Sequence, residues 1–451
     1  MTSLATDRII VGLGTTGLSC ARYLRAMGIE FQVVDSRQSP PGLSAFQQEF
    51  ADVPLTLGEF PQALLNGARE LIVSPGVSIA TPAISKAREA GVVITGDIDM
   101  FSRRVKAPVV AVTGSNGKST VVSLLAAMAR AAGLNVGLGG NLDGAEAAPA
   151  LDLLRQPPKD LYILELSSFQ LETTQSLNAE AAVILNVSDD HMDRYEDKHA
   201  YEAAKQRIFL GARHIVVNRD DGASQPWHEA ARVVSSFGLN APQAGEWGLV
   251  KSTDGYQLSH AGNLVLSASE MRLAGRHNLA NALAALALGE AIGLPVPAML
   301  EALREFPGLP HRCQWLRNLR GVDYYNDSKG TNVGASIVAI ESLGEMLKGK
   351  LVLIAGGIDK EADFSIMKPV VRQFVKLAIL IGRDARHLAA AFKDSIEITF
   401  AANLTEAVKI AAMQAREGDA VLLSPACASY DMFSDFTHRG RVFAEAVEGL
   451  Q

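Results

Sequence analysis

The fold of this chain is decided by one stretch of its sequence, Val109-Val110-Ala111-Val112-Thr113-Gly114-Ser115-Asn116-Gly117-Lys118-Ser119-Thr120. The apolar residues 109–112 predict a buried strand, and the pattern of residues 119–132 predicts a helix. The glycines between them predict a tight turn. A strand, a glycine turn and a helix in this order indicate a phosphate-binding loop, because backbone N–H groups of the turn and the helix N-terminus attract anions.

The end of this turn carries the residue types that bind the phosphates of ATP. Lys118 can reach the β- and γ-phosphates, and the Ser119 hydroxyl can bind Mg²⁺. The ordinary motif has a glycine where this chain has Val112, so the loop is a shorter form that begins at Gly114. A purely structural turn is the alternative interpretation. The residues expected to surround ATP are Gly114, Ser115, Asn116, Gly117, Lys118, Ser119, Thr120 and Val121.

Further polar residues follow two other predicted strands. Glu165 ends the strand 161–166 and can complete a magnesium site, although for this residue taken alone a solvated acid at a strand end is the more common interpretation. Residues 186–195 gather several acids, His191 and an arginine where ligands bind in α/β sheets. Single members of this group can also be helix caps or surface charges. Lys205 lies in a predicted helix, where composition alone favours a solvated side chain.

A second glycine turn lies near the start of the chain, at Gly12-Leu13-Gly14-Thr15-Thr16-Gly17. It matches G-x-G-x-x-G between a predicted strand, 8–13, and a predicted helix, 16–27, and Asp35 ends the next strand. This pattern indicates the diphosphate of a nucleotide more securely than it indicates NAD. A tight structural turn remains the other interpretation, and no group of residues suited to hydride transfer accompanies the motif.

Bulk properties narrow the class of protein. The chain has 451 residues, of which 48% are hydrophobic and 20% charged, so several domains with substantial cores are expected. Its net charge of -7 gives no electrostatic reason to bind nucleic acid or an anionic membrane. The three cysteines match no zinc or redox spacing, and no apolar run suggests a signal peptide or a membrane span. We therefore expect a cytoplasmic protein.

Short apolar runs alternate with helical patterns along most of the chain, which predicts an α/β fold with largely parallel sheets. Three domains are expected, at residues 1–102, 103–308 and 309–451. The linker is Phe306-Pro307-Gly308-Leu309-Pro310, with two prolines and a glycine in five residues. The polar stretch 222–267 is expected to be rich in β-structure.

Taken together, several motifs resemble the Mur ligase family. They are residues 113–120, 165–172, 186–195 and 205–209, then Arg276-His277-Asn278 with Asn281, and Leu309-Pro310-His311-Arg312. The first glycine turn, residues 326–332 and residues 424–440 are similar to the branch of the family that adds D-glutamate. The resemblance spans nearly the whole chain and is weakest over residues 222–267.

The resemblance implies a Rossmann-like N-terminal domain, a central domain of P-loop type with a mostly parallel sheet, and a Rossmann-like C-terminal domain. It implies an ATP-dependent amide ligase that adds D-glutamate to UDP-N-acetylmuramoyl-L-alanine through an acyl phosphate, in peptidoglycan precursor synthesis. A folate-glutamate ligase would not need the first domain. An NAD-dependent oxidoreductase leaves Lys118, Ser119, Glu165 and His191 without a role, and an ATPase that acts only as a binding partner leaves the amino-acid pocket unused.

The resemblance also implies roles for single residues. Lys118 would stabilise the transferred phosphoryl group; Ser119 and Glu165 would hold one Mg²⁺, and His191 with a carbamoylated (N-carboxylated) Lys205 a second. The remaining ligand contacts would be Asn281, Arg312 and Asp327 for ATP; Thr15, Thr16, Asp35, Ser36 and Arg37 for the UDP end; Gly76 and Asn141 along the substrate path; and Lys329, Thr331, Lys360, Ser429 and Phe436 for D-glutamate. A monomer whose third domain closes over ATP is expected.

Overall fold

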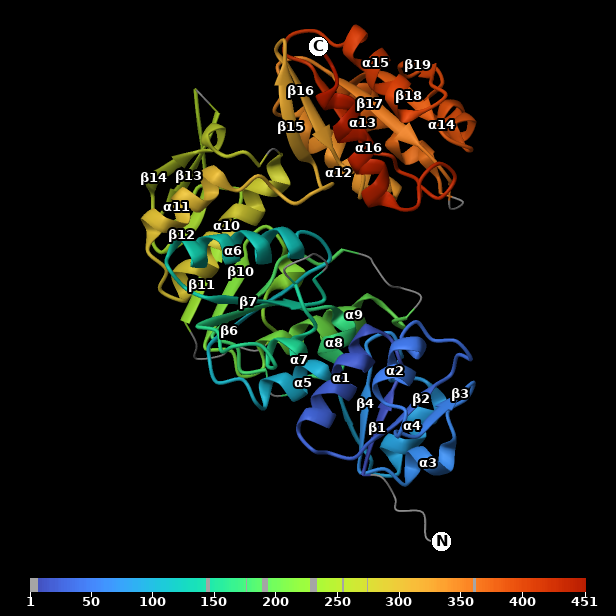
Figure 1. Ribbon diagram of the computed structural model, residues 1–451. Coiled ribbons are helices and arrows are strands. Elements are labelled where there is room, and N and C mark those ends of the chain that lie inside the picture. The colour runs from blue at the N-terminus through green and yellow to red at the C-terminus, as the bar shows by residue number, and fades with distance from the viewer. Residues whose placement is uncertain are drawn as a thin grey trace. The chain divides into compact units, whose positions relative to one another are not determined.

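The structure is a computed structural model that describes residues 7–142, 147–175, 177–188, 194–227, 233–253, 255–273, 275–359 and 362–451. It contains three sheets, each with helices packed on it (Figure 1). The chain packs as two compact units, residues 1–250, 258–265 and 283–302 in the first and residues 251–257, 266–282 and 303–451 in the second. No helix in the described part of the chain is long and apolar enough to cross a membrane.

The first sheet has the order β3-β2-β1-β4-β5, and every pairing in it is parallel. Side chains alternate between its two faces, so Ile9 and Val11 pack with α3 and α4, and Ile10 packs with α1 and α2. Its elements are β1 (Arg8–Val11), α1 (Thr15–Ala26), β2 (Gln32–Asp35), α2 (Leu43–Glu49), β3 (Leu55–Leu57), α3 (Gln62–Asn66), β4 (Glu70–Val73), α4 (Pro82–Glu89), β5 (Val93–Thr95) and α5 (Asp97–Ser102).

The second sheet has nine strands in the order β14-β13-β12-β11-β10-β9-β6-β8-β7. Its strands are β6 (Val109–Thr113), β7 (Val136–Gly140), β8 (Leu161–Glu165), β9 (Ala181–Ile184), β10 (His214–Asn218), β11 (Val233–Phe237), β12 (Glu246–Ser252), β13 (Gly255–His260) and β14 (Asn263–Ser267). The last four confirm the β-rich prediction for residues 222–267. Because β6 runs parallel to both neighbours, β8 and β9, the carboxyl ends of these three strands meet at one edge.

The helices that accompany this sheet include the one predicted after the glycine turn. They are α6 (Lys118–Ala131), α7 (Ala150–Leu153), α8 (Ser168–Glu172), α9 (Lys198–Gln206), α10 (Arg276–Ala291) and α11 (Val296–Glu305). One apolar core joins the first two sheets: Ile10 and Ile72 of the first share a buried cluster with Ala111 and Leu164 of the second. Burial of a continuous core stabilises the packing of the first sheet on the second.

The third sheet has the order β15-β16-β20-β17-β18-β19, parallel except for β15 at one edge. Leu351 and Leu353 pack with α12, α13 and α14, whereas Val352 and Ile354 pack with α15 and α16 on the other face. Its elements are β15 (Gln314–Leu319), β16 (Val322–Asn326), α12 (Val333–Gly344), β17 (Leu351–Gly356), α13 (Lys368–Phe374), β18 (Val375–Ile381), α14 (Ala385–Phe392), β19 (Glu397–Phe400), α15 (Leu404–Gln414), β20 (Ala420–Leu423) and α16 (Phe436–Glu448).

These three sheets confirm the predicted α/β class with mostly parallel strands. The predicted linker, residues 306–310, lies between α11 and β15 and forms neither a helix nor a strand. The domain boundaries after residues 102 and 308 stay a prediction.

Candidate functional site

The phosphate loop, residues 114–119, follows β6 and includes the first two residues of α6, as the sequence predicts. Gly114 has φ +150° and Gly117 has φ +84°, conformations that favour glycine. A Cβ at Gly114 would lie 3.0 Å from the Cβ of Leu185 and 3.3 Å from the backbone nitrogen of Asn186, so the loop needs glycine there for space as well. The N–H groups in the first turn of α6 have no acceptor within the helix, which leaves them suited to an anion.

The loop is held from the end of β9 by Asn186. Its side-chain oxygen accepts from the backbone N–H of Asn116 at 2.8 Å, and its amide donates to the Asn116 carbonyl at 3.1 Å. The Ser115 hydroxyl accepts from the N–H of Ser188 at 3.0 Å. The sequence reasoning assigned no role to Asn186. Its position directly after a parallel strand beside the loop was the available signal.

Two lysines converge on the carbonyl of Gly114. Lys118 donates from Nζ to the Gly114 and Ser115 carbonyls at 2.9 and 3.0 Å, and Lys205 donates to the Gly114 carbonyl at 3.1 Å. Only 2% of Lys205 is exposed, and its Nζ lies 4.5 Å from the ring centroid of Tyr201. The composition-based expectation of a solvated lysine is therefore wrong at this position. The Tyr201 hydroxyl, which sequence reasoning overlooked, lies 3.1 Å from that of Ser115.

Beside the loop, a serine hydroxyl and a glutamate carboxylate lie in hydrogen-bond contact. The Ser119 hydroxyl donates to Glu165 Oε2 at 2.7 Å, and the Asn141 side chain donates to Glu165 Oε1 at 3.3 Å. Glu165 is 3% exposed, and these hydroxyl and carboxylate oxygens are the donor type that Mg²⁺ prefers. Within the residues that the structure describes, no group of three or more His, Cys, Asp or Glu side chains forms a metal cluster. His191 and Lys360, two predicted site residues, lie outside the described residues.

Val121, the last residue expected around ATP, points into the core and not toward the loop surface. Its side chain is fully buried in the core, and its N–H donates to the Gly117 carbonyl at 3.0 Å. Neither group is therefore open to a ligand, and Val121 supports the first turn of α6 from inside.

The first glycine turn is built by close backbone packing. Gly12 has φ +96°, and a Cβ on Gly17 would lie 2.1 Å from the Gly12 carbonyl oxygen. The Ser74 hydroxyl donates to the same carbonyl at 2.8 Å. Thr15 and Thr16 occupy the first turn of α1, with Thr15 exposed. Both threonines thus lie at a helix N-terminus, a place that favours an anion, and their contact with a diphosphate stays a prediction.

Asp35 ends β2 beside this turn and is 2% exposed. Its carboxylate accepts from the Leu13 N–H at 2.7 Å and from the Arg37 guanidinium at 2.7 and 2.9 Å. Burial by itself raises the pKa of Asp35, but the hydrogen bonds from Arg37 and Leu13 outweigh it and hold this pKa below its ordinary value. Ser36 and Arg37, the next two residues of the chain, are exposed at the same corner, and contact of the three residues with uracil stays a prediction.

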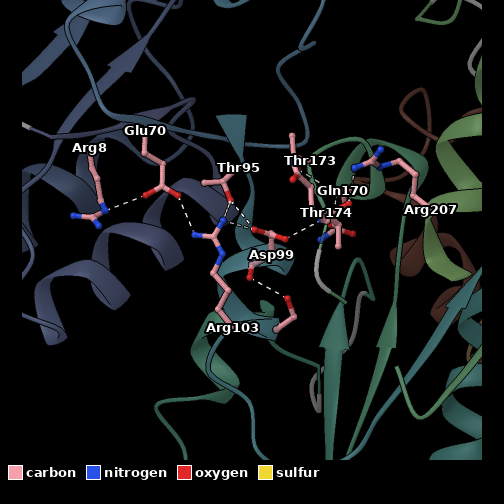
Figure 2. Close-up of polar contacts among 11 residues, drawn as sticks. Arg8, Glu70, Thr95, Asp99, Arg103, Gln170, Thr173, Thr174 and Arg207 are labelled. Carbon is pink, nitrogen blue, oxygen red and sulfur yellow. Dashed lines mark hydrogen bonds and ion pairs between the residues drawn. The ribbon is translucent and has the colours of Figure 1, made fainter. Parts of the chain in front are cut away.

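A charged network docks the first sheet onto the second (Figure 2). Glu70 pairs with Arg8 at 3.0 Å and with Arg103 at 3.2 Å, and Arg103 pairs with Asp99 at 2.6 Å. The other Asp99 oxygen accepts from the backbone N–H of Gln175 at 2.8 Å. Helix α5 is thereby tied to the segment that follows α8.

Two further side chains, Gln170 and Arg207, secure α8 itself, and Figure 2 shows Arg207 beside Thr174. Gln170 donates to Asp97 at 3.2 Å, and Arg207 donates to the carbonyls of Leu171 and Thr174 at 2.8 and 2.7 Å. Complete burial raises the pKa of Asp97 to about 6, although the hydrogen bond from Gln170 acts in the opposite direction. Since α8 follows β8 directly, the contacts of Gln170 and Arg207 fix the element next to Glu165.

The second compact unit holds most of the predicted amino-acid pocket. Lys329 Nζ lies 3.9 Å from the ring centroid of Phe436, a cation–π contact, and Ser328 donates to the Phe436 carbonyl at 2.8 Å. Ser429 is buried on the loop after β20, and Thr331 is half-buried two residues after Lys329. Lys329 and Phe436 thus lie in contact, and their part in binding D-glutamate stays a prediction.

Arg439 of α16, which the sequence reasoning overlooked, ties this pocket together. It is 1% exposed and donates to the Ser328 hydroxyl and carbonyl at 3.0 and 2.8 Å, and to the Cys427 carbonyl at 3.1 Å. Burial lowers the pKa of Arg439 to about 10, which leaves it charged at neutral pH.

The predicted nucleotide contacts of this unit differ in exposure. Asp327 is 7% exposed and accepts from the Cys313 N–H at 3.1 Å and from the Ser424 hydroxyl at 2.8 Å. Burial raises the pKa of Asp327 to about 6 against these hydrogen bonds. Arg312 is exposed, and Asn281 is buried on α10.

Comparison with known proteins places the chain. Three family models match it in succession: the MurD-like N-terminal domain of Mur ligases over residues 6–96, the Mur ligase middle domain over residues 112–289, and the Mur ligase glutamate ligase domain over residues 311–427. A UDP-N-acetylmuramoylalanine–D-glutamate ligase of Pseudomonas aeruginosa is 52% identical over 452 residues and covers 100% of both chains. An enzyme of the same name from Nitrosococcus oceani is 52% identical over 99% of this chain and 97% of its own.

Solved structures confirm the three-domain α/β class. The crystal structure of MurF ligase from Thermotoga maritima in complex with ADP has a TM-score of 0.61 at 17% identity and covers 99% of this chain and 98% of its own. At this identity the likeness concerns the fold alone. The sequence matches show more, because about half of the residues are identical over the full length of the chain. These matches and the three family models show that the chain belongs to the Mur ligase family.

Proposed function

We propose that this chain is an ATP-dependent ligase that joins D-glutamate to UDP-N-acetylmuramoyl-L-alanine in peptidoglycan precursor synthesis. The main observation in support is the phosphate loop with the Ser119–Glu165 pair beside it, in which the two side-chain oxygens lie 2.7 Å apart. The substrates follow from the D-glutamate ligases that are 52% identical over the full chain. A ligase of this class needs both the nucleotide site and the separate first sheet with its own glycine turn.

The chemistry proceeds through two displacements. A carboxylate oxygen of the alanine residue attacks the γ-phosphorus of ATP, and ADP leaves with the electrons of the broken bond. The amine of D-glutamate then attacks the acyl carbon, loses a proton, and expels inorganic phosphate to leave an amide. Activation is needed because a free carboxylate would have to lose oxide, a very poor leaving group. Most of the catalysis is then positioning and charge stabilisation.

The loop residues supply that stabilisation. Lys118 is already folded over the loop by its bonds to the Gly114 and Ser115 carbonyls, so its charge is held where the phosphates of ATP would bind. Ser119 and Glu165 would hold one Mg²⁺, which neutralises phosphate charge when bound. The donor set fits this ion because both ligand atoms are oxygens, held 2.7 Å apart by the first turn of α6 and the end of β8.

We further propose that Lys205 is carbamoylated and, with His191, holds a second Mg²⁺. Carbamoylation joins the neutral amine to CO₂ with loss of one proton, and it replaces a buried cation with a group that carries anionic oxygens. The modified nitrogen keeps one hydrogen, so it can still donate to the Gly114 carbonyl that Lys205 contacts at 3.1 Å. The burial of Lys205 supports this role, because an unmodified ammonium is costly to bury.

The first sheet would bind the nucleotide end of the substrate. Asp35 is held ionised by Arg37 and Leu13, which suits it to accept a hydrogen bond from the N–H of uracil. Thr15 and Thr16 would contact the diphosphate at the start of α1.

In the second unit the dicarboxylate D-glutamate would bind near Lys329, Phe436, Ser429, Thr331 and Lys360. The adenosine and phosphate contacts of Asn281, Arg312 and Asp327 stay predictions. We place the reaction in the cytoplasm, carried out by a monomer.

The test is phosphate release from ATP and Mg²⁺ with UDP-N-acetylmuramoyl-L-alanine present and single amino acids added in turn, in buffer that contains bicarbonate. We expect release only with D-glutamate, together with a product heavier by one glutamate residue. Turnover that requires L-lysine, diaminopimelate or a folate would reject the proposed substrates. No turnover with any amino acid would reject the ligase itself.

A further inference from the structure

Arg194 bridges the first two sheets. The proposed function assigns no role to this residue. Its guanidinium donates to the carbonyls of Pro75 and Val77 at 2.6 and 3.3 Å, and it pairs with Glu172 at 2.7 Å. It also lies over the ring of Phe169, 3.9 Å from the centroid. Only 11% of the Arg194 side chain is exposed, so these contacts are largely shielded from solvent and salt.

The anchoring side of this bridge is a short helix that other side chains hold in place. Phe169 and Glu172 both belong to α8, which begins three positions after Glu165 in the sequence. Arg207 holds the carbonyls that flank the end of α8, and Figure 2 shows how its side chain reaches this segment. Arg194 is therefore fastened to the element that follows the proposed Mg²⁺ ligand.

The held side is the Gly76 loop, defined as residues 74–77 after β4. The two carbonyls that Arg194 binds belong to the residues on either side of Gly76. Gly76 is exposed, and a Cβ built on it would meet nothing within 4 Å. Ser74 of the same loop bonds to Gly12 of the first glycine turn at 2.8 Å. The loop thus lies between the proposed diphosphate site and the second sheet, with open space in front of Gly76.

From this geometry we propose that Arg194 is a positioning residue that holds the Gly76 loop on the path of the nucleotide substrate. It sets where the acyl end of UDP-N-acetylmuramoyl-L-alanine lies relative to Glu165. The inference rests on the proposed function and deepens it. A guanidinium suits this task because its planar fork presents several donors in fixed directions, whereas a lysine has a single donor atom on a flexible stem.

A merely structural role makes a different prediction. If Arg194 only stabilised the docking of the two sheets, its loss would lower the melting temperature without affecting one substrate more than the others. Arg103, whose side chain is 49% exposed, supplies a control at the same junction. It pairs with Glu70 and Asp99 but makes none of the contacts to the Gly76 loop described for Arg194. The variants to compare are Arg194→Lys, Arg194→Met, Gly76→Ala and Arg103→Met.

The first measurement is the KM for each substrate with folded protein. We expect Arg194→Lys to raise the KM for UDP-N-acetylmuramoyl-L-alanine about tenfold, with Arg194→Met higher still, because small misplacements of a reacting group are costly. The KM values for ATP and D-glutamate should stay within about twofold. Gly76→Ala should raise the same KM without lowering the melting temperature, since its methyl group points into open space. Arg103→Met should lower the melting temperature and leave all three KM values unchanged.

The second measurement is calorimetric binding without ATP, which does not depend on turnover. Arg194→Lys should weaken binding of UDP-N-acetylmuramoyl-L-alanine as much as it raises the KM, and it should leave binding of uridine monophosphate unchanged. Equal weakening of both ligands, an unchanged affinity for the full substrate, or a KM increase shared by ATP would overturn the positioning role. If the unaltered protein forms no product, the proposed function has failed, and the binding comparison still decides the role of Arg194.

Discussion

The hydrogen bonds between Asn186 and the phosphate loop give a sharp test of how the loop is ordered. The side chain makes two bonds to the backbone of Asn116, at 2.8 and 3.1 Å, across 70 residues of sequence. At a net of about 1 kcal/mol for each bond, Asn186→Ala removes about 2 kcal/mol that favours the ordered loop. If ATP must restore this order when it binds, the KM for ATP rises by up to about 30-fold.

Asn218 provides a matched control on the neighbouring strand. It is half-buried like Asn186, and it also makes two bonds to backbone, to the Leu185 carbonyl at 2.8 Å and from the Asp220 N–H at 2.9 Å. Both alanine variants should lose a similar free energy of unfolding, measured by urea denaturation. Only Asn186→Ala should raise the KM for ATP in the phosphate-release assay. A KM for ATP that changes by less than about twofold in Asn186→Ala, with the same stability loss, refutes the reasoning.

Three further predictions concern charge. Glu165→Gln keeps an acceptor for the Ser119 hydroxyl but loses the anion, so the Mg²⁺ concentration for half-maximal rate should rise at least about tenfold. Lys205→Arg keeps a cation but removes the amine that CO₂ would modify, and activity should fall about a hundredfold or more. Burial raises the pKa of Asp97 from 3.8 to about 6, so its ionisation costs the folded state stability above that pH. Asp97→Asn should therefore raise the free energy of unfolding at about pH 8, by at most about 3 kcal/mol.

For each of these three predictions, a specific result would contradict it. Glu180→Gln is the control for Glu165→Gln, because Glu180 lies just before β9 and so at the opposite edge of the sheet. It should leave the Mg²⁺ dependence of the rate unchanged. Equal shifts in both variants would show that Glu165 does not bind the ion. If activity survives removal of CO₂ and isotope-labelled bicarbonate gives no carbamate signal, the proposed carbamoylation of Lys205 is wrong. The gain from Asp97→Asn should shrink as the pH falls through about 6, and a gain independent of pH would show that charge is not its cause.

Sequence reasoning succeeded where neighbouring residues carry the signal. The strand predicted at 109–112 and the helix predicted at 119–132 are β6, Val109–Thr113, and α6, Lys118–Ala131. The position of Glu165 beside the loop followed from the rule that parallel strands present their carboxyl ends at one edge, and Val112 does pair with Glu165. Both inferences need only local propensity and a general property of parallel sheets.

The same reasoning failed where a contact joins distant segments. Arg194 reaches Pro75 across 119 residues, and no local pattern marks either residue as the partner of the other. Composition favoured a solvated Lys205, because most helical lysines are exposed, yet the packing of α9 buries it against the loop. The antiparallel edge strand β15 also went unpredicted, since its pairing with β16 depends on the sheet already formed.

By itself the sequence determined the α/β class, the two glycine turns, and the lysine and serine that follow the second turn. These features depend on backbone conformations and periodicities that span a few residues. Only the tertiary structure decided that Asn186 clamps the loop, that Lys118 and Lys205 meet at Gly114, and that Arg194 holds the Gly76 loop. The physical reason is that these contacts form between segments brought together by sheet order and by a shared core, which no local propensity encodes.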